Sequence, residues 1–482
     1  MIKHGRWLGC ALIVGVLAAQ AGTASGGSLR TGFLDPAAAG AGSIPGFPIN
    51  SDVAAQRVKG AGGSIVRLYA SWRVLAPTPP TNPNDYNWTP LDNQVNAAVA
   101  QGLDVMLTLR SAPDWAQQHN CGVDDSRGAC RPDPQEFHDF AVDIANHFSA
   151  PQFGAHVKYW GMWNEPNLPS FLAPQYVKKN GRKTLVSPDL YRTLLNRGAR
   201  AIHSVNPNLV VVAGETAPFG HPNSPSPLLF LRKLLCVDNG GHKTCSKSRV
   251  EADVWATHPY TSGDPWHHAF GKDDVSFGDL GQWKKLVKGA ARSGRFIESP
   301  GNVRRSIRLW NTEFSWDTKP PDDKGVPMKL HARWTAEALY RTWSLGIETL
   351  FWLQLRDYPV GDVYQSGLYR YKNSTTQMGS PKLSLTAFRF PFVAYASKGR
   401  IKVWGRTPDS NAHTIKIERR TSSGGWHVVK RATANGSGIF RKAWSSGDMS
   451  GKYRARLANG GVSVGFSLVR PHDKFVNPFG GP

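Results

Sequence analysis

In the middle of the chain, LDVMLTL (103–109) is followed by PQEFHDFAVDIANHF (134–148), VKYWGMW (157–163), SPDLYRTLLNRGARAIHSV (187–205) and LVVVAGE (209–215). The first, third and fifth segments are short apolar runs, which are typical of strands buried on both faces. In the second and fourth segments, apolar residues recur three and four positions apart, as an amphipathic helix requires. This order predicts parallel strands that are joined by crossover helices.

The same alternation extends in both directions along the chain, from residue 30 to about residue 395. Further strands are predicted at LRTGFLD (29–35), SIVRLYA (64–70), ADVWATH (252–258), SIRLWNT (306–312) and ETLFWLQL (348–355). A last helix is predicted at SLTAFRFPFVAYA (384–396). Eight strand–helix units predict an α/β fold, a (β/α)8 TIM barrel over residues 30–396. An open doubly wound sheet is the alternative, but no glycine-rich phosphate loop follows the first strand.

A different pattern begins at residue 397 and continues to residue 482. Its short runs with period-two alternation are RIKVWGR, HTIKIERR, WHVVKRA, GIFRKAW, KYRARLA and VSVGFSL. Gly, Ser, Asn and Asp separate these runs, so the pattern predicts a C-terminal antiparallel β-sandwich domain.

The chain is strongly basic, with 58 Lys and Arg against 35 Asp and Glu and a net charge of +23. Residues 397–482 hold 16 Lys and Arg but only 4 Asp and Glu. This excess suggests an anionic cell-wall polymer as a partner of the last domain, with a solvated basic surface as the alternative. Nucleic acid is not expected as a partner, because no recognition motif accompanies the charge.

The N-terminal sequence predicts an export leader over residues 1–21. The basic stretch MIKHGRW precedes the apolar run LGCALIVGVLAA, and Ala19-Gln20-Ala21 offers small residues for cleavage. The apolar run is too short to form a stable membrane anchor. We therefore expect a secreted protein that is extracellular or associated with the cell wall.

Four cysteines follow the leader, in CGVDDSRGAC (121–130) and CVDNGGHKTC (236–245). An even number in an oxidising compartment predicts two disulfides, for which three pairings exist. We favour the local pairs Cys121–Cys130 and Cys236–Cys245, which would clip short loops. A zinc site is the alternative, but the spacing differs from that of zinc ligand pairs. No metal and no cofactor is expected.

The carboxyl ends of the predicted strands carry the candidate site, because in a TIM barrel these ends face the active site. The residues there are Arg67, Arg110, Asn164, Glu165, Glu215, His258, Tyr260, Glu313 and Trp352. Glu165 and Glu313 come as a pair, in WGMWNEPN (160–167) and LWNTEFSW (309–316). Glu215 lacks such a setting and is expected to be an ion-pair partner.

These motifs resemble those of clan A glycoside hydrolases, in particular family 39 and the cellulase-type family 5. WGMWNEPN resembles the clan's fourth-strand signature, LWNTEFSW its seventh-strand segment, and ATHPY (256–260) its His-x-Tyr element. Trp352 in FWLQL resembles the aromatic platform of the eighth strand. One position departs from family 5, in which a histidine usually stands near the end of strand three, because LTLRSAPDW places Arg110 there.

The resemblance implies a secreted retaining glycoside hydrolase that cleaves O-glycosidic bonds, expected to be β-linked, in a poly- or oligosaccharide. It makes Glu165 the general acid/base and Glu313 the nucleophile. Arg67 and Tyr260 would hold Glu313 ionised. The remaining substrate-binding residues would be Asn164, His258 and Trp352, with Asn164 at the sugar 2-hydroxyl.

A non-catalytic glycan-binding barrel, anchored to the cell wall by the basic C-terminal domain, is the alternative function. Such a protein would not need both Glu165 and Glu313. A transglycosylase would share every catalytic residue with a hydrolase. Neither the sugar, the linkage nor endo or exo action is encoded in a readable motif, because specificity resides in the strand-to-helix loops.

Overall fold

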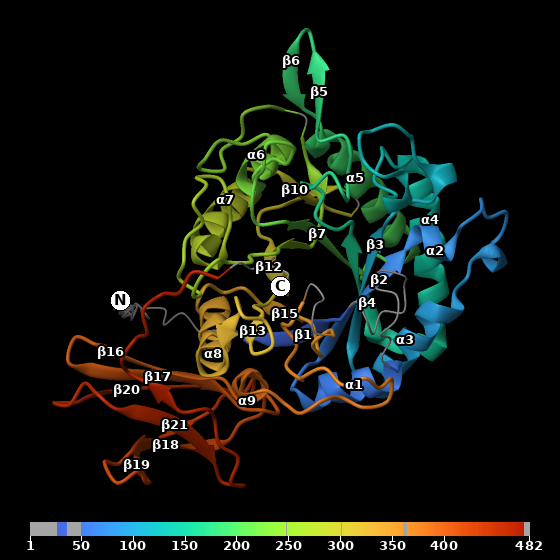
Figure 1. Ribbon diagram of the computed structural model, residues 1–482. Helices are drawn as coiled ribbons and strands as arrows, with labels where there is room; N and C mark the ends of the chain where they lie inside the picture. The colour runs from blue at the N-terminus through green and yellow to red at the C-terminus, as the bar shows by residue number, and fades with distance from the viewer. Residues whose placement is uncertain (1–26, 36–49, 247, 300, 360–363, 477–482) are drawn as a thin grey trace, which may run out of the picture.

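Figure 1 presents the computed structural model of the chain, which describes residues 27–476 apart from 36–49, 247, 300 and 360–363. The predicted leader (1–21) lies outside the described residues. No helix in the described part is both long enough and apolar enough to cross a membrane.

Eight parallel strands form a closed barrel at the centre of the molecule (Figure 1). In order around the barrel they are β1 (Arg30–Leu34), β15 (Thr349–Leu353), β12 (Arg308–Phe314), β9 (Val254–Thr257), β7 (Val210–Thr216), β4 (Val157–Met162), β3 (Asp104–Arg110) and β2 (Ile65–Ser71). Each strand overlaps one of the eight predicted strand segments. The predicted (β/α)8 barrel is therefore confirmed.

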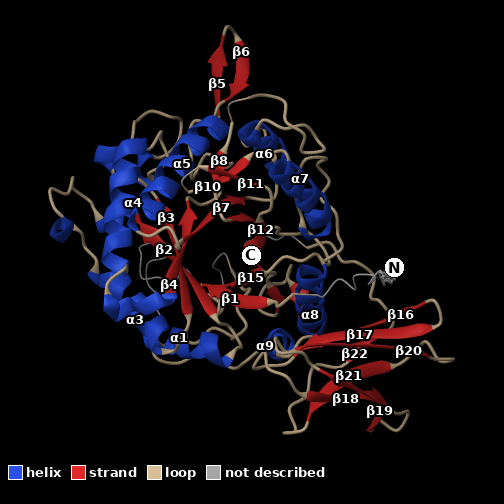
Figure 2. Ribbon diagram, turned by 180° about the vertical axis from the view of Figure 1, so that it is seen from behind, coloured by secondary structure: helices blue, strands red, loops and turns tan. Residues whose placement is uncertain are grey.

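Helices cover the outside of the barrel (Figure 2). They are α1 (Ser51–Gly60), α2 (Trp72–Leu75), α3 (Thr89–Ala100), α4 (Pro134–Phe148), α5 (Ser187–Val205), α6 (Pro227–Leu235), α7 (Leu280–Arg292) and α8 (Met328–Ser344). Helix α4 illustrates why these segments are helical. The Asp133 carboxylate accepts hydrogen bonds from two N–H groups of the first turn, and Pro134 occupies the first helical position. Phe137, Phe140 and Ile144 recur at helical spacing and are buried.

Alternation along the strands decides what fills the barrel. One apolar cluster consists of Ile65, Met106, Tyr159, Val212, Val254, Ala256, Trp310 and Phe351. Two positions further along β2 and β3 come Arg67 and Thr108, which bond to each other, and two further come Tyr69 and Arg110. Because side chains two positions apart share a face, the interior changes from apolar to polar toward the carboxyl ends. The candidate site therefore lies at that end of the barrel.

Two antiparallel sheets follow the barrel, so the predicted β-sandwich is confirmed in part. One sheet contains β16 (Phe392–Ser397), β17 (Arg400–Arg406) and β20 (Ile439–Ser445). The other contains β19 (Trp426–Thr433), β18 (Thr414–Arg420), β21 (Lys452–Leu457) and β22 (Phe466–Ser467). All of the pairings between these strands are antiparallel.

The helix predicted over residues 384–396 is wrong in its second half. Helix α9 spans only Leu383–Arg389, and the six residues of β16 pair with β17. Pro391 accounts for the difference, because proline has no N–H group to donate and clashes with a preceding helical turn. The C-terminal sheets therefore begin at Phe392, ahead of the predicted boundary at residue 397.

The C-terminal sheets pack directly against the barrel. The buried Arg406 guanidinium donates to the Leu29 carbonyl (3.0 Å) and to Thr31 Oγ1 (3.1 Å). The Trp404 ring lies 5.5 Å from the rings of Tyr340 and Trp343 on α8. These contacts bury polar and aromatic groups that removal of the C-terminal sheets would expose.

Smaller elements decorate the loops. The hairpin of β5 (Tyr176–Lys179) and β6 (Arg182–Leu185) projects from the body of the molecule (Figures 1 and 2). The remaining strands are β8 (Val250–Glu251), β10 (Phe296–Glu298), β11 (Asn302–Arg304), β13 (Thr318–Lys319) and β14 (Val326–Pro327). Disulfides join Cys121 to Cys130 and Cys236 to Cys245, which is the favoured local pairing.

Candidate active site

A single buried guanidinium organises the mouth of the barrel. Arg67 Nη2 donates to Asn164 Oδ1 (2.8 Å) and to Glu215 Oε2 (3.0 Å), while Nη1 donates to Glu313 Oε2 (3.0 Å). Arg67 Nε donates to Thr108 Oγ1 (3.0 Å) on the neighbouring strand. The structure thus makes Glu215 an ion-pair partner, as its sequence context predicts. Two carboxylates share one positive charge where solvent screens it little.

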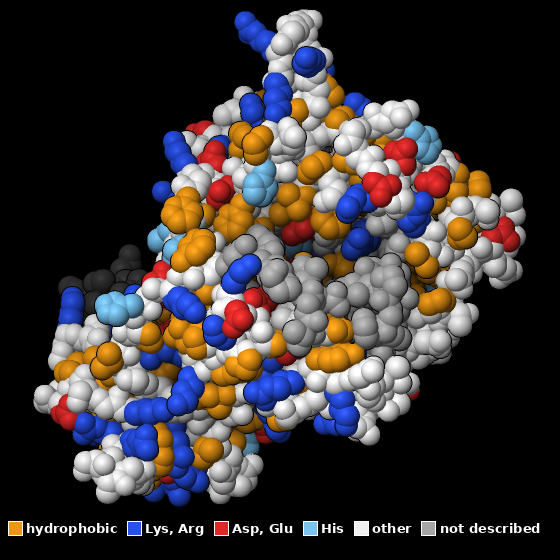
Figure 3. Space-filling view, viewed as in Figure 1, with side chains coloured by type: hydrophobic (Ala, Val, Ile, Leu, Met, Phe, Trp, Pro, Cys, Tyr) orange, Lys and Arg blue, Asp and Glu red, His pale blue; other side chains and the backbone are white. Residues whose placement is uncertain are grey.

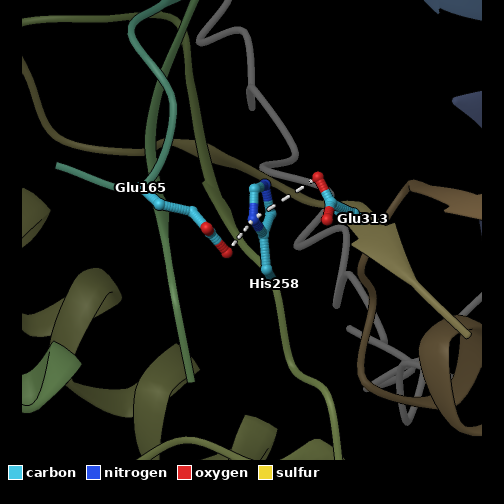
Figure 4. Close-up of side chains that lie close together, drawn as sticks. All are labelled: Glu165, His258 and Glu313. Carbon is cyan, nitrogen blue, oxygen red and sulfur yellow. Dashed lines mark hydrogen bonds and ion pairs between the residues drawn. The ribbon is translucent and has the colours of Figure 1, made fainter. Parts of the chain in front are cut away.

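Glu165 and Glu313 lie on either side of His258 (Figure 4). His258 Nδ1 is 2.9 Å from Glu165 Oε1 and 3.8 Å from Glu313 Oε2. One oxygen of each carboxylate and one imidazole nitrogen all lie within 4.8 Å of one another. Burial lowers the pKa of His258 to about 3, so the ring is neutral at neutral pH. Its contact with Glu165 is then a hydrogen bond rather than an ion pair.

The backbone after β4 is unusual at the point where Glu165 stands. Trp163 and Glu165 have φ angles of 74° and 40°, in the left-handed region that non-glycine residues seldom adopt. Two backbone hydrogen bonds hold this turn, from Trp163 N to Leu109 O and from Glu165 N to Glu215 O, each 3.0 Å. Strained backbone of this kind often clusters at functional sites. Here it ties the Glu165 turn to the ends of β3 and β7.

The Glu313 carboxylate accepts hydrogen bonds at both of its oxygens. The Tyr260 hydroxyl donates to Oε1 (2.7 Å), and the Tyr69 hydroxyl lies 3.4 Å from Oε2, the oxygen that Arg67 also contacts. Both oxygens of Glu313 are therefore held in place by hydrogen bonds from neighbouring strand ends.

The pKa of Glu165 is shifted by its surroundings. It is 9% exposed, and burial raises its pKa to about 7, against the opposing positive charges of Arg67 and Arg110. A protonated Glu165 would donate to the neutral His258 ring, which matches their contact of 2.9 Å. Burial also raises the pKa of Glu215 to about 7, although Glu215 is paired with Arg67.

The same three side chains, Glu165, His258 and Glu313, are spaced closely enough to hold a metal ion. The ligand chemistry fits such an ion poorly at Glu313, because both of its oxygens already accept hydrogen bonds from Tyr260 and Arg67. A cation there would compete with the buried guanidinium. The contacts therefore fit two carboxyl groups that are each hydrogen-bonded to neighbouring side chains better than they fit the ligands of a metal ion.

The expected platform residue Trp352 does not reach the site. Its side chain is fully buried, its indole N–H donates to the Ser366 carbonyl (2.9 Å), and its ring packs against Phe388 of α9. Strand alternation explains the error, because its neighbours Phe351 and Leu353 contact the barrel's interior clusters and Trp352 lies on the outer face. The assignment of Trp352 to the substrate site is therefore wrong.

The other predicted residues meet at one place. Arg67, Asn164, Glu165, His258, Tyr260 and Glu313 are linked by the contacts described above. Two aromatic residues of the mouth were missed, Tyr69 and Tyr364. Tyr69 was detectable, since it follows Arg67 by two positions and so shares its face. Tyr364 comes from the loop after β15, where no pattern gives its position.

A closed barrel with two carboxyl groups at strand ends fits the class of barrel-type glycoside hydrolases. The sequence model of the cellulase family (glycosyl hydrolase family 5) matches residues 39–282, just over half of the 482 residues. The chain therefore belongs to glycosyl hydrolase family 5. The matched segment includes Glu165 and His258 and ends before Glu313. The resemblance to family 39 stays a prediction.

The chain is also similar to several solved structures, whereas no curated protein sequence matches it. One is a GH30 endoxylanase from Clostridium papyrosolvens, with 13% identity over 87% of this chain and 95% of that chain (TM-score 0.46). Another is a glucosidase from Croceicoccus marinus, with 14% identity over 87% and 93% (TM-score 0.47). Endo-glycoceramidase II from Rhodococcus sp. has 14% identity over 87% and 97% (TM-score 0.48). The family assignment does not rest on these distant similarities.

Proposed function

We propose that this protein is a retaining glycoside hydrolase that cleaves O-glycosidic bonds in a poly- or oligosaccharide, with Glu165 as acid/base and Glu313 as nucleophile. The observation that carries the proposal is the pair of carboxyl groups, whose nearest ligand atoms lie within 4.8 Å on either side of His258. Retaining enzymes need carboxyl groups about 5–5.5 Å apart, whereas inverting enzymes leave room for water at about 6.5–9.5 Å.

In the first step Glu313 attacks the anomeric carbon while Glu165 protonates the leaving oxygen. Arg67 and Tyr260 donate hydrogen bonds to Glu313 and orient its carboxyl group before the attack. The raised pKa of Glu165 supports its protonated starting state. Asn164 accepts from Arg67 through Oδ1, so its amide NH2 group serves as the donor to the sugar 2-hydroxyl.

In the second step water, activated by Glu165, hydrolyses the glycosyl-enzyme. Once Glu313 is esterified, its negative charge is gone and the pKa of Glu165 should fall, so that Glu165 can act as a base. Interception of the intermediate by a sugar instead of water would make the enzyme a transglycosylase. A non-catalytic binding barrel would not require the contacts of Arg67 with Glu313 or of His258 with Glu165.

The remaining parts of the proposal concern where the enzyme works. Residues 1–21 act as an export leader, and the two disulfides agree with an oxidising, extracellular location. The basic C-terminal domain holds the barrel near an anionic polymer such as one of the cell wall. Figure 3 supports this role, because Lys and Arg side chains are dense over the C-terminal sheets.

The test combines a substrate screen with covalent trapping. A panel of aryl β-glycosides and polysaccharides identifies the sugar, and the matching 2-deoxy-2-fluoroglycosyl fluoride then traps the intermediate. Peptide mapping should place the trapped sugar on Glu313, and Glu313→Ala should abolish labelling. Turnover without any trapped glycosyl-enzyme, or a label on another residue, would overturn the assignment.

A further inference from the structure

The mouth of the barrel contains a positive charge that the proposed mechanism does not use. Arg110 ends β3 and, by alternation from Met106 and Thr108, shares the face that lines the barrel. Its side chain is only half-buried, and it lies close enough to Glu165 to lower the pKa of that residue. Arg110 therefore faces the place where the reaction is proposed to occur.

Within the described residues, Arg110 has no acidic partner. Its Nε donates to Ser111 Oγ (3.2 Å), whereas Arg67, on the next strand, is paired with Glu215 and Glu313. One guanidinium of the mouth is thus neutralised by carboxylates and the other is not. An arginine held in a site without a carboxylate is a preformed receptor for an oxyanion, since its fork matches carboxylate, sulfate or phosphate groups.

Aromatic rings hold Arg110 in place. Its Cζ atom lies 4.5 Å from the centroid of the Tyr69 ring and 5.2 Å from that of the Phe171 ring. Such stacking fixes the direction of a guanidinium while leaving its N–H groups unpaired. A fixed donor loses less conformational entropy when it binds a ligand.

A second group of cations without acidic partners lies on the β5–β6 hairpin, which follows Phe171 in the chain. In the β5–β6 hairpin, Lys178 stands opposite Lys183, and Lys179 stands opposite Arg182. Like charges directly opposite each other destabilise a two-stranded pair. All four side chains are exposed and, among the residues that the structure describes, none forms an ion pair. A bound polyanion would relieve this repulsion.

We propose that the substrate is an anionic glycan: the Arg110 guanidinium receives a carboxylate or sulfate group of a sugar at the mouth, and the β5–β6 hairpin contacts further charges of the same polymer. This inference rests on the proposed function, because it names the substrate class of the same site. It requires no new chemical step, since the charged group is bound and not altered.

The test compares charged sugars with uncharged counterparts, using Glu165→Gln to stop turnover. Tetrasaccharides of hyaluronan carry carboxylates and those of κ-carrageenan carry sulfate esters, and each has a neutral form after methyl esterification or desulfation. Calorimetry should give at least about tenfold tighter binding of the charged member in one pair, and the pair that responds identifies the group bound.

Arg110→Gln, added to this background, should reduce the preference to less than about twofold. Arg110→Lys keeps the charge but loses the fork, so it should leave an intermediate preference. Arg73→Gln is the matched control. This substitution also removes one positive charge, but Arg73 is already paired with Asp114. Equal affinity within both pairs, including no binding of either member, would overturn the proposal. So would a preference that survives Arg110→Gln.

The hairpin is tested with Lys178→Ser, Lys179→Ser and Arg182→Ser combined, which spares the Lys183 contact with Tyr176. Affinity for long hyaluronan at low salt should fall several-fold, and affinity for the tetrasaccharide should not change. Unchanged affinity for the polymer would contradict the role of the hairpin. Failure of these binding tests alongside successful trapping on Glu313 would reject the anionic substrate and leave the glycosidase proposal intact.

Discussion

The barrel mouth and the C-terminal sheets both contain many charged groups, but they arrange them in opposite ways. At the mouth, the buried Arg67 is shared by Glu215, Glu313 and Asn164 at 2.8–3.0 Å. On the C-terminal sheets, most charges are positive and exposed. The half-buried Lys416 stands opposite both Arg431 and Arg456. Among the described residues of these sheets, Glu418 pairs with Arg454 and Arg456, and Asp448 pairs with Arg419.

The difference separates two uses of charge. Buried groups at fixed distances shift one another's pKa and can move a proton at a chosen atom. Exposed charges of one sign act over longer distances and are screened by salt, with a Debye length of about 10 Å at 0.1 M and about 3 Å at 1 M. Substitutions at the mouth should therefore change the rate of bond cleavage. Substitutions on the sheets should change only the attraction to an anionic polymer.

The largest effect should come from Glu313. Glu313→Ala should lower turnover by about 10⁴-fold or more, the scale expected when a covalent nucleophile is removed. Added azide should enter the vacated space and yield a glycosyl azide of inverted configuration, detectable by NMR. Wild-type turnover in Glu313→Ala would remove Glu313 from the mechanism.

Glu165→Gln should have a large effect that depends on the leaving group. Loss of general acid help costs about 10²–10⁴-fold. Substrates with poor leaving groups should suffer most, because an activated aryl oxygen departs without a proton. Steady-state rates across a series of aryl glycosides would give the dependence, and equal losses for all of them would argue against Glu165 as the acid.

The dependence of kcat/KM on pH should contain a contribution from Glu165. The proposed acid must be protonated in the free enzyme, and burial raises its pKa to about 7. Activity should therefore fall above pH 7, by about tenfold per pH unit. Arg110→Gln removes a positive charge that lowers the pKa of Glu165, so the fall in kcat/KM should begin at a higher pH. A basic limb that stays in place in Arg110→Gln would contradict this coupling.

The smallest effect on chemistry should come from the C-terminal sheets. Lys402, Lys430, Arg431 and Lys442 are exposed, and no ion pair is found for them among the described residues. Replacing all four by Ser should weaken sedimentation with anionic cell walls several-fold at low salt and leave turnover of a small glycoside unchanged. These substitutions are preferable to deletion of the sheets, because Arg406 is hydrogen-bonded to the barrel and Trp404 packs against it. If the wild type and the four-Ser variant sediment equally with cell walls at low salt, the basic surface is merely solvated and does not bind the polymer.

Most of the barrel could be predicted from the sequence, because strands buried on both faces are continuous apolar runs and the candidate site lies where they end. Strand ends also indicated that Glu165 and Glu313 would lie near each other, and their nearest oxygens are within 4.8 Å; their roles stay a prediction. Trp352 was misplaced, because the choice of strand face needs the barrel's register, which is irregular between Asn311 and Phe314 on the neighbouring strand. Tyr364 comes from a loop without periodicity, and only the fold brings it to the mouth.

The configuration of the first product tests the central claim most directly. ¹H NMR in the first minutes of hydrolysis, before mutarotation, distinguishes the two anomers of the released sugar. Glu165 and Glu313 each have an oxygen within 4.8 Å of the other, which is nearer to the spacing of a retaining pair, about 5–5.5 Å, than to that of an inverting pair. The initial product should therefore have the same anomeric configuration as the substrate. An inverted initial product would contradict the double displacement and the role of Glu313 as nucleophile.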